Sequence, residues 1–528
     1  MSLWKKYKTK YQKLEKNLKE EKMKIFFILL ISLALIVILL TPFASAESRG
    51  GNLIIGVDQE VIGLDPNVVT SFSSFRRIDL LYNKLVKMDY DFNIVPDLAD
   101  SWEIPDSLTY IFHLKEGVKF HNGRELTADD VKFSLERVLD PKTASPGRSY
   151  IAPISDIEVI NKYTIKIKLS SPLASFLSGL ASNNCSIVPK EEVEKYGNLQ
   201  RDAVGTGPFK LGEWVPDNYM KLVRNPDYFE KGFPYLDAVT FRVIPEQTSL
   251  LAGIKSGSLD MATINEGSII LQAKKDPNLV VMQIPGLNLR TFGFNNTREP
   301  FDDVRVRQAI ALAIDRDEIV TAAEFEMAQP SGPLSASVKK WAKPLEELPF
   351  SKRNLKKARE LLTEAGYPDG FSFNIVTSSS YEGGLAVAQV IQSQLKEIGL
   401  RPELKVVEWG IYIDRWVKRD FDSIVELRGG SDEPDRFLYR SLHSTGGVNN
   451  WLFEDEEVDK LLNEGRRLVK YEDRKPIYDK IQVLLSEKMP VIFLYVPFQT
   501  QVLSPNVKNF RQIGNGALQY LSQTWLEE

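Results

Sequence analysis

The chain has 528 residues, of which 43% are hydrophobic and 26% are charged. This length and balance indicate a soluble globular protein of two or three domains and exclude a largely disordered chain. The net charge is −4, and about −10 without the lysine-rich first 46 residues, which argues against a nucleic-acid-binding protein.

The first 46 residues have the pattern of a secretory leader. Residues 1–22 are rich in lysine, residues 25–40 form an apolar run, and residues 44–46 read Ala-Ser-Ala. Together these features are typical of a cleaved signal peptide. Met23 also fits a start, which would make residues 1–22 an extension. Because the uncharged stretch is long enough to span a bilayer, retention as an N-terminal membrane anchor is the alternative.

The chain has a single cysteine, Cys185. We therefore expect no disulfide within the chain. No cysteine stands directly after the apolar run, so we do not expect the lipid anchor of a lipoprotein. The protein is expected to act outside the cytoplasmic membrane, either free or held by its own leader.

The first elements after the leader alternate between strands and helices. Residues 53–57 are apolar and predict a buried strand, whereas residues 164–169 alternate between polar and apolar, which predicts a half-exposed strand. Between them, Thr127 followed by two acids predicts a helix start. Val131 and Leu135 then fall on one face of that helix.

The same signals continue toward the C-terminus. Asp315, with acids after it, predicts another capped helix start before Ile319. An apolar stripe within residues 477–485 predicts a helix that ends before Pro490, and residues 491–496 predict a buried strand. The chain is therefore expected to be mixed α/β.

Residues that carry chemistry do not cluster in the sequence. The three histidines, His113, His121 and His443, form no metal-ligand pair at helical spacing. The glycine-rich residues 205–208 lack the lysine of a phosphate-binding loop. We therefore expect no metal, no cofactor and no catalytic residues. A hydrolase whose site assembles from distant residues is the alternative.

Five stretches of the chain, in order, give a sharper indication. They are residues 95–102 (VPDLADSW), 112–137, 204–210 (VGTGPFK), 225–229 (NPDYF) and 301–316. Together they resemble the oligopeptide-, dipeptide- and nickel-binding proteins of ABC importers, the family 5 solute-binding proteins. The likeness extends from about residue 53 to about residue 507.

The resemblance implies a fold of the class II periplasmic-binding-protein type. It has two α/β lobes joined by crossover strands, with an extra subdomain on the first lobe. After the leader (1–46), the first lobe would comprise residues 47–90, 206–294 and 495–528, the extra subdomain residues 91–205, and the second lobe residues 295–494. The crossovers would fall near residues 293–295 and 493–495, which suit a hinge.

The resemblance also implies a function. The lobes would enclose a ligand, because only contacts made in the closed state favour closure. The closed protein would then deliver that ligand to the permease subunits of an ABC importer. We therefore expect a monomeric, non-enzymatic binding protein, periplasmic or otherwise extracytoplasmic, with no nucleic-acid partner.

The ligand-binding residues are expected in the second lobe. Peptide binders of this family hold the ligand's α-amino group with an aspartate three residues before a proline, and Ser431 has that position before Pro434. Asp432 is one residue late, so either the loop shifts and Asp432 binds the amine, or the ligand lacks one. A loop-capping role is its structural alternative. Arg428 stands at a position where the family often has an aromatic residue. It would pair with a ligand carboxylate or stack on a ligand ring. A surface ion pair is its structural alternative.

Three more residues complete the predicted site. Trp409 matches a family position that often lines the cleft, although a core position fits a tryptophan equally well. Tyr381 lies in a polar run, at the cleft mouth or in an ordinary loop. Asn450 precedes an expected helix and either contacts the ligand or caps that helix.

The class of ligand is left open between two alternatives. The resemblance favours a small peptide. The shifted aspartate favours an oligosaccharide, whose pocket needs aromatic platforms and neutral hydrogen-bonding groups. Nickel or haem fits less well, because the histidines are scattered. A membrane-tethered solute sensor is a third class, which an uncleaved leader would favour.

Overall fold

A computed structural model describes residues 49–378 and 384–527, together with isolated positions between 4 and 23. The chain divides into two compact units, Met1–Ser48 and Arg49–Glu528. The predicted apolar run and cleavage site at residues 25–46 lie outside the described residues. Within the described part, no helix has both the length and the apolar character of a membrane span.

A twelve-stranded sheet runs through the larger unit in the order β16-β15-β17-β13-β18-β11-β1-β10-β9-β8, with β12 and β14 also paired to β18. The strands of the first lobe are β1 (Asn52–Val57), β8 (Phe209–Val215), β9 (Tyr219–Arg224), β10 (Ala238–Val243), β11 (Met261–Thr263) and β12 (Val280–Pro285). Those of the second lobe are β13 (Leu289–Phe294), β14 (Ala328–Pro330), β15 (Ser372–Ser378), β16 (Arg401–Val407) and β17 (Ser423–Arg428).

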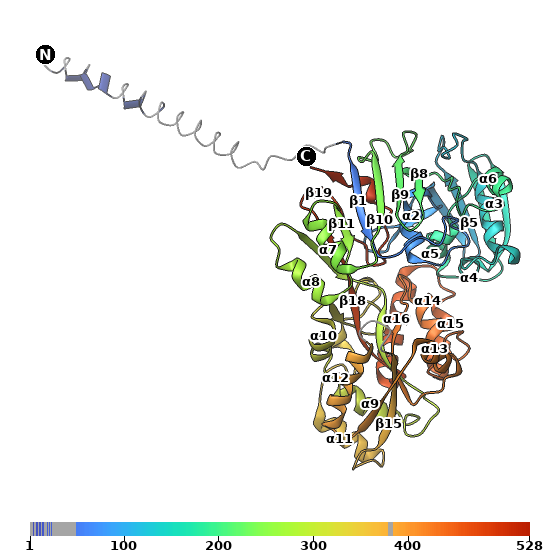
Figure 1. Ribbon diagram of the computed structural model, residues 1–528, viewed down its shortest axis with the longest axis vertical. Helices are drawn as coiled ribbons and strands as arrows, with labels where there is room; N and C mark the ends of the chain where they lie inside the picture. Colours follow the sequence, from blue (N-terminus) through green and yellow to red (C-terminus); the bar gives the residue numbers. More distant parts are fainter. Residues whose placement is uncertain are drawn as a thin grey trace. The chain divides into compact units, whose positions relative to one another are not determined.

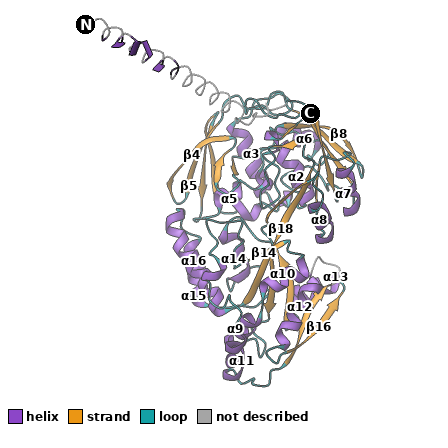
Figure 2. Cartoon of the chain, turned by 90° about the vertical axis from the view of Figure 1, so that its left-hand side faces the viewer, coloured by secondary structure: helices purple, strands orange, loops and turns teal. Residues whose placement is uncertain are grey.

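One long strand, β18 (Val491–Leu503), belongs to both lobes. Residues 491–495 pair with β13, and residues 498–503 pair with β12. Figure 2 shows β18 extending between the helices α2, α7 and α8 and the group α9–α13. The predicted strand at 491–496 is confirmed, and it continues to Leu503 because the chain passes into the first lobe.

The first lobe carries the extra subdomain. The lobe's helices are α2 (Phe72–Leu81), α7 (Gln247–Lys255) and α8 (Gly267–Lys274). The subdomain has an antiparallel sheet, β4-β5-β7-β6. Its elements are β4 (Ala99–Asp106), β5 (Thr109–Leu114), α3 (Ala128–Leu139), α4 (Arg148–Ile151), β6 (Ile154–Asn161), β7 (Thr164–Leu169), α5 (Phe176–Leu180) and α6 (Lys190–Tyr196). The short pairs β2 (Val86–Met88) with β3 (Ile94–Pro96) and β19 (Val507–Lys508) with β20 (Trp525–Leu526) lie outside both large sheets.

The local predictions for these segments are confirmed. The Asp130 side chain accepts a 2.9 Å hydrogen bond from the backbone N–H of Thr127, so α3 begins where the capping signal predicted it. Val131 and Leu135 are buried on its inner face. β7 alternates between buried and more exposed residues, as a half-exposed strand does.

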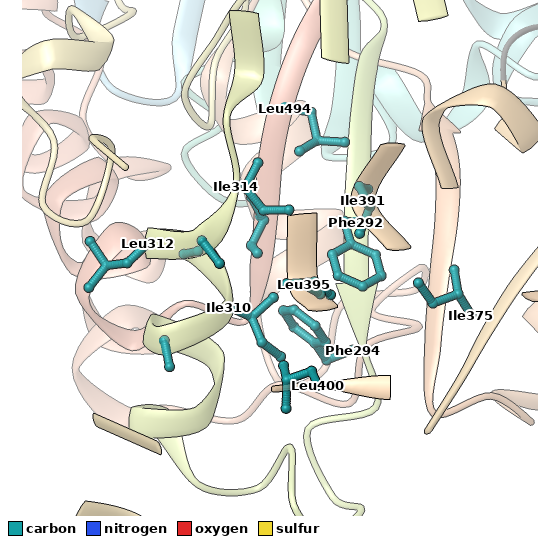
Figure 3. Close-up of a cluster of buried hydrophobic side chains, with 14 of the residues drawn as sticks. Phe292, Phe294, Ile310, Leu312, Ile314, Ile375, Ile391, Leu395, Leu400 and Leu494 are labelled. Carbon is teal, nitrogen blue, oxygen red and sulfur yellow. The ribbon is translucent and has the colours of Figure 1, made fainter. Parts of the chain in front are cut away.

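Eight helices of the second lobe lie within the described residues. They are α9 (Val304–Ala313), α10 (Arg316–Glu324), α11 (Leu355–Glu364), α12 (Gly384–Lys396), α13 (Trp409–Lys418), α14 (Pro434–Leu442), α15 (Glu456–Gly465) and α16 (Tyr471–Lys488). Asp315 accepts a hydrogen bond from the N–H of Glu318, which confirms the predicted start of α10. Figure 3 shows part of the core, in which Phe292 and Phe294 of β13 cluster with Ile391 and Leu395 of α12.

The two connections between the lobes lie next to each other. β12 ends at Pro285, β13 begins at Leu289, and the backbone N–H of Gly286 donates a 2.8 Å hydrogen bond to the carbonyl of Pro497. Residues 293–295 were predicted as a crossover, but Gly293 pairs with β17 inside the second lobe. A fully buried strand and an apolar linker look alike in sequence. The lobe ranges stay a prediction, and this pairing favours a crossover at 286–288.

The mixed α/β class expected from the sequence is confirmed by this arrangement. Figure 1 shows the elements of the first lobe and subdomain grouped apart from α9–α13, with β18 extending between the two groups. The residues between β17 and α14 (429–433) lie next to this connection. A loop in this position can contact a ligand held between the lobes.

Candidate functional site

The larger of two cavities beside this loop lies between the lobes and has a volume of about 590 Å³. We call it the interlobe cavity. The first lobe and the subdomain contribute most of its lining, and the second lobe contributes Gly430, Asp432 and Arg436. A cavity with walls from both lobes changes its shape whenever the lobes move relative to each other.

Asp432 makes a direct contact across the interlobe cavity. Its carboxylate accepts a 2.8 Å hydrogen bond from the hydroxyl of Ser178 on α5 of the subdomain. The neighbouring hydroxyl of Ser431 donates a second bond of 3.2 Å. The guanidinium of Arg436 lies 3.5 Å away, one helical turn along α14. Asp432 is therefore a partly compensated carboxylate that joins the two lobes.

Arg436 also reaches the subdomain. Its guanidinium carbon lies 4.0 Å from the centre of the Tyr150 ring, a cation–π distance. Burial lowers the pKa of Arg436, but Asp432 and Tyr150 outweigh that effect and raise it. Arg436 stays charged, so a ligand amine would compete with it for the carboxylate of Asp432.

A second cavity, of about 380 Å³, lies within the second lobe. We call it the second-lobe cavity. Four aromatic side chains line it, Trp409, Tyr412 and Trp416 from α13 and Phe437 from α14. Trp409 and Tyr412 are stacked with ring centres 5.2 Å apart. These rings provide broad apolar walls for a ligand group.

A buried glutamate, Glu426, organises one wall of the second-lobe cavity. It accepts hydrogen bonds from the indole N–H groups of Trp451, at 2.6 Å, and Trp416, at 2.7 Å. Arg428 contacts it at 3.4 Å and places its guanidinium over the Trp451 ring, 4.6 Å from the centre. Arg428 also donates to the carbonyl of Val448 at 2.8 Å. The contacts with Glu426 and Val448 hold Arg428 in place.

Arg290, on β13, contributes a further guanidinium to the second-lobe cavity. It is buried, donates a 3.2 Å hydrogen bond to the hydroxyl of Tyr495, and lies 4.0 Å from Glu324. Burial lowers the pKa of Arg290, but Tyr495 and Glu324 outweigh it and raise that pKa. Burial also raises the pKa of Glu324.

The structure brings some of the predicted site residues together and separates others. Asp432 lines the interlobe cavity, whereas Trp409 and Arg428 line the second-lobe cavity. Asn450 is buried, lines neither cavity, and donates its side-chain amide to the carbonyl of Trp416 at 2.8 Å. Tyr381 lies outside the described residues.

Several site residues were not predicted from the sequence. Arg436 is one helical turn after Asp432, so its spacing was a usable signal. Arg290, Glu426 and Ser178 come from segments far apart in the chain, and only folding brings them to the cavities.

His121 is held by backbone contacts. His121 contacts the carbonyl of Gly207 at 3.1 Å and accepts from the N–H of Gly205 at 3.2 Å. Burial lowers its pKa to about 4, so it is neutral at physiological pH. In the part of the chain that the structure describes, no three His, Cys, Asp or Glu residues form a group able to hold a metal ion.

Known proteins resemble the chain over most of its length. The model of the bacterial extracellular solute-binding proteins, family 5 Middle, matches residues 93–449. Oligopeptide-binding protein AppA of Bacillus subtilis is 30% identical over 515 residues, which cover 92% of this chain and 93% of AppA. Heme-binding protein A of Haemophilus influenzae is 31% identical over 508 residues, covering 89% of this chain and 92% of that protein.

A solved structure shares the fold. DppA from Helicobacter pylori, a periplasmic binding protein in complex with the peptide STSA, is 29% identical and has a TM-score of 0.73. The match covers 91% of this chain and 99% of DppA. The likeness therefore extends over about nine-tenths of this chain.

Proposed function

Because the chain belongs to the bacterial extracellular solute-binding proteins of family 5, we propose that it captures a peptide between its lobes and delivers it to an ABC import permease. The family and the two-lobed fold class predicted from the sequence are confirmed. AppA is named for oligopeptide binding, and the DppA structure contains a peptide. Both resemble this chain over about nine-tenths of its length.

The observation that carries the proposal is the interlobe cavity. Its volume of about 590 Å³ falls within the range of small-molecule sites, and residues of both lobes line it. The adjacent crossings at Gly286 and Pro497 allow the lobes to rotate about one small region. A peptide that contacts both lobes would favour the closed state by its contacts there.

Asp432 is our proposed acceptor for the peptide's α-ammonium. Among the described residues that line the interlobe cavity, it is the only acidic one from the second lobe. Ser178 and Arg436 already contact this carboxylate, so the ammonium would replace or share their contacts. An oligosaccharide, which carries no such ammonium, remains the competing ligand class in the test below.

We propose that the protein binds and releases its ligand without converting it. Transport then requires an affinity that allows release, and a micromolar dissociation constant corresponds to about −8 kcal/mol. The proposal includes a monomer acting outside the cytoplasmic membrane, exported by its leader or tethered by it. Oligomeric state and leader cleavage are read from the mass and the N-terminal residue of the secreted protein.

Differential scanning fluorimetry tests the ligand class. Peptides of two to nine residues, an oligosaccharide panel and hemin are each added to the purified protein. A ligand that binds only the folded state raises its stability by about 2.7 kcal/mol at 100 times the dissociation constant. We expect peptides to raise the melting temperature.

Two results would contradict this function. A rise in melting temperature with oligosaccharides or hemin, and none with peptides, would exclude peptide capture. Bound peptide is also recovered and weighed by mass spectrometry. A changed mass would show that the protein is an enzyme.

A further inference from the structure

Among the described residues that line the second-lobe cavity, positive charges outnumber negative ones. They include four arginines and one glutamate. Three of these arginines lie near a carboxylate, in the pairs Arg290–Glu324 at 4.0 Å, Arg428–Glu426 at 3.4 Å and Arg436–Asp432 at 3.5 Å. The fourth, Arg440, is exposed, and within the described part of the chain its side chain has no acidic partner. Among the described lining residues, the guanidinium of Arg440 is therefore available to a ligand.

The helix α14 directs Arg440 toward the second-lobe cavity. Arg436, Phe437, Arg440 and Ser441 all line it, and their spacing of one and four residues places them on one helix face. A surface arginine elsewhere on α14 would not share that face. The position of Arg440 is therefore suited to a ligand group that has entered the cavity.

The only acid among the described lining residues is already occupied. Both carboxylate oxygens of Glu426 accept indole N–H groups, from Trp451 and Trp416, and Arg428 lies beside them. A ligand ammonium would have to replace those contacts and would lie among the four arginines of the described lining. The second-lobe cavity therefore disfavours a basic group and favours an anion.

The aromatic walls add a requirement for apolar surface. Trp409, Tyr412 and Phe437 leave a space of about 380 Å³. The aliphatic part of a side chain packs well against such rings, while its charged end reaches a guanidinium. A carboxylate on a short hydrocarbon stem meets both conditions.

The two cavities adjoin at Arg436 and the loop before it. Arg436 lines both, and Gly429 and Gly430 of the same loop line one each. A β carbon placed on Gly429 would meet no atom within 4 Å, so the backbone there leaves open space. A peptide in the interlobe cavity is therefore close enough to extend one group into the second-lobe cavity.

We infer that the captured peptide carries a carboxylate, from an acidic side chain or from its C-terminus, that enters the second-lobe cavity and pairs with Arg440. This inference rests on the proposed peptide capture and assigns it a preferred substrate class. Arg440 is then a specificity-determining residue, and the aromatic rings hold the stem that carries the carboxylate.

The test uses three pools of heptapeptides that differ in one feature. The first has one glutamate at varied positions and an amidated C-terminus, the second has glutamine in its place, and the third has glutamine with a free C-terminal carboxylate. Each pool is retained on the immobilised protein and quantified by mass spectrometry. We expect one or both carboxylate pools to be retained about tenfold better than the amidated glutamine pool.

Variants assign the preference to Arg440. In Arg440→Gln the preference falls to about one, whereas Arg440→Lys keeps most of it because the charge remains. Arg467→Gln is the matched control, since Arg467 is an exposed arginine of the second lobe that lines neither cavity. It is expected to keep the wild-type preference. The melting temperature of each variant confirms folding.

The outcomes separate this inference from the proposed function. Retention of the glutamate pool alone identifies the side chain as the source of the carboxylate, and retention of the third pool identifies the C-terminus. Equal retention of all three pools, or an unchanged preference in Arg440→Gln, would overturn the inference while leaving peptide capture in place. Retention of no pool would overturn both.

Discussion

Gly293 and Trp451 are in such close contact that a β carbon at residue 293 would lie 2.2 Å from the indole nitrogen of Trp451. That nitrogen donates the 2.6 Å hydrogen bond to Glu426. The missing side chain on β13 is therefore what lets the tryptophan reach the glutamate. The wall of the second-lobe cavity depends on this contact.

Gly293→Ala should destabilise the protein by about 2–4 kcal/mol, because the displaced indole leaves Glu426 buried with one partner fewer. Urea unfolding measures this change. Gly429→Ala is the control, since a β carbon there meets no atom within 4 Å, and it should change stability by less than about 0.5 kcal/mol. Equal stability of both variants would show that Trp451 lies elsewhere in solution.

Gly430 approaches the crossover between the lobes just as closely. A β carbon on Gly430 would lie 1.9 Å from the carbonyl oxygen of Leu287, so Gly430→Ala must push the loop away from residues 286–288. We expect it to weaken peptide binding by about tenfold or more. Gly447→Ala should leave binding nearly unchanged, because Gly447 is exposed, lines neither cavity, and a β carbon there meets no atom within 4 Å. Titration calorimetry measures both, and unchanged affinity in Gly430→Ala would contradict this loop position.

Asp432→Asn tests the proposed ammonium acceptor. The variant should bind peptides with a free amine at least tenfold more weakly, because the amide supplies no charge to an ammonium. N-acetylated peptides should bind the variant and the wild type equally. Ser178→Ala is a control that removes the 2.8 Å contact but keeps the carboxylate. An equal loss for free and acetylated peptides would assign Asp432 a structural role.

The local structure of the chain was predictable from short patterns. The acids after Thr127 and at Asp315 marked two helix starts, because capping depends on a few neighbouring residues. The crossover between the lobes was harder to predict from the sequence. Residues 289–294 are buried at every position, so their pattern did not distinguish a strand of the second lobe from a linker.

The candidate site was predictable only in part. Asp432, Trp409 and Arg428 line the cavities, and a motif or a family position pointed to each of them. Glu426 and Arg290 carried no such signal, because their roles depend on partners such as Trp451 and Tyr495 from distant segments. Long-range contacts of this kind are set by the tertiary fold and leave no local pattern.

A buried carboxyl beside the site gives the protein a pH dependence. Burial, with Glu433 nearby, raises the pKa of Asp435 to about 7, and its Oδ1 has no hydrogen-bond partner among the described residues. The folded state therefore holds a proton that the unfolded state releases near pH 4. Between these values the unfolding free energy falls as pH rises, by roughly 2–3 kcal/mol from pH 5 to pH 8.

Asp435→Asn should remove that contribution. Relative to the wild type, the variant is expected to gain about 2–3 kcal/mol between pH 5 and pH 8, because its amide does not ionise. Urea unfolding at the two pH values measures the difference, and contributions that both proteins share, such as that of His121, cancel. A constant difference between the two proteins at both pH values would show that Asp435 ionises as an ordinary carboxyl.

Lobe closure is tested most directly by small-angle X-ray scattering of the larger unit, residues 49–528, with and without saturating peptide. If the two lobes enclose the peptide, the radius of gyration decreases on binding while the scattering mass stays that of one chain. Tight binding with an unchanged radius of gyration would contradict capture by closure.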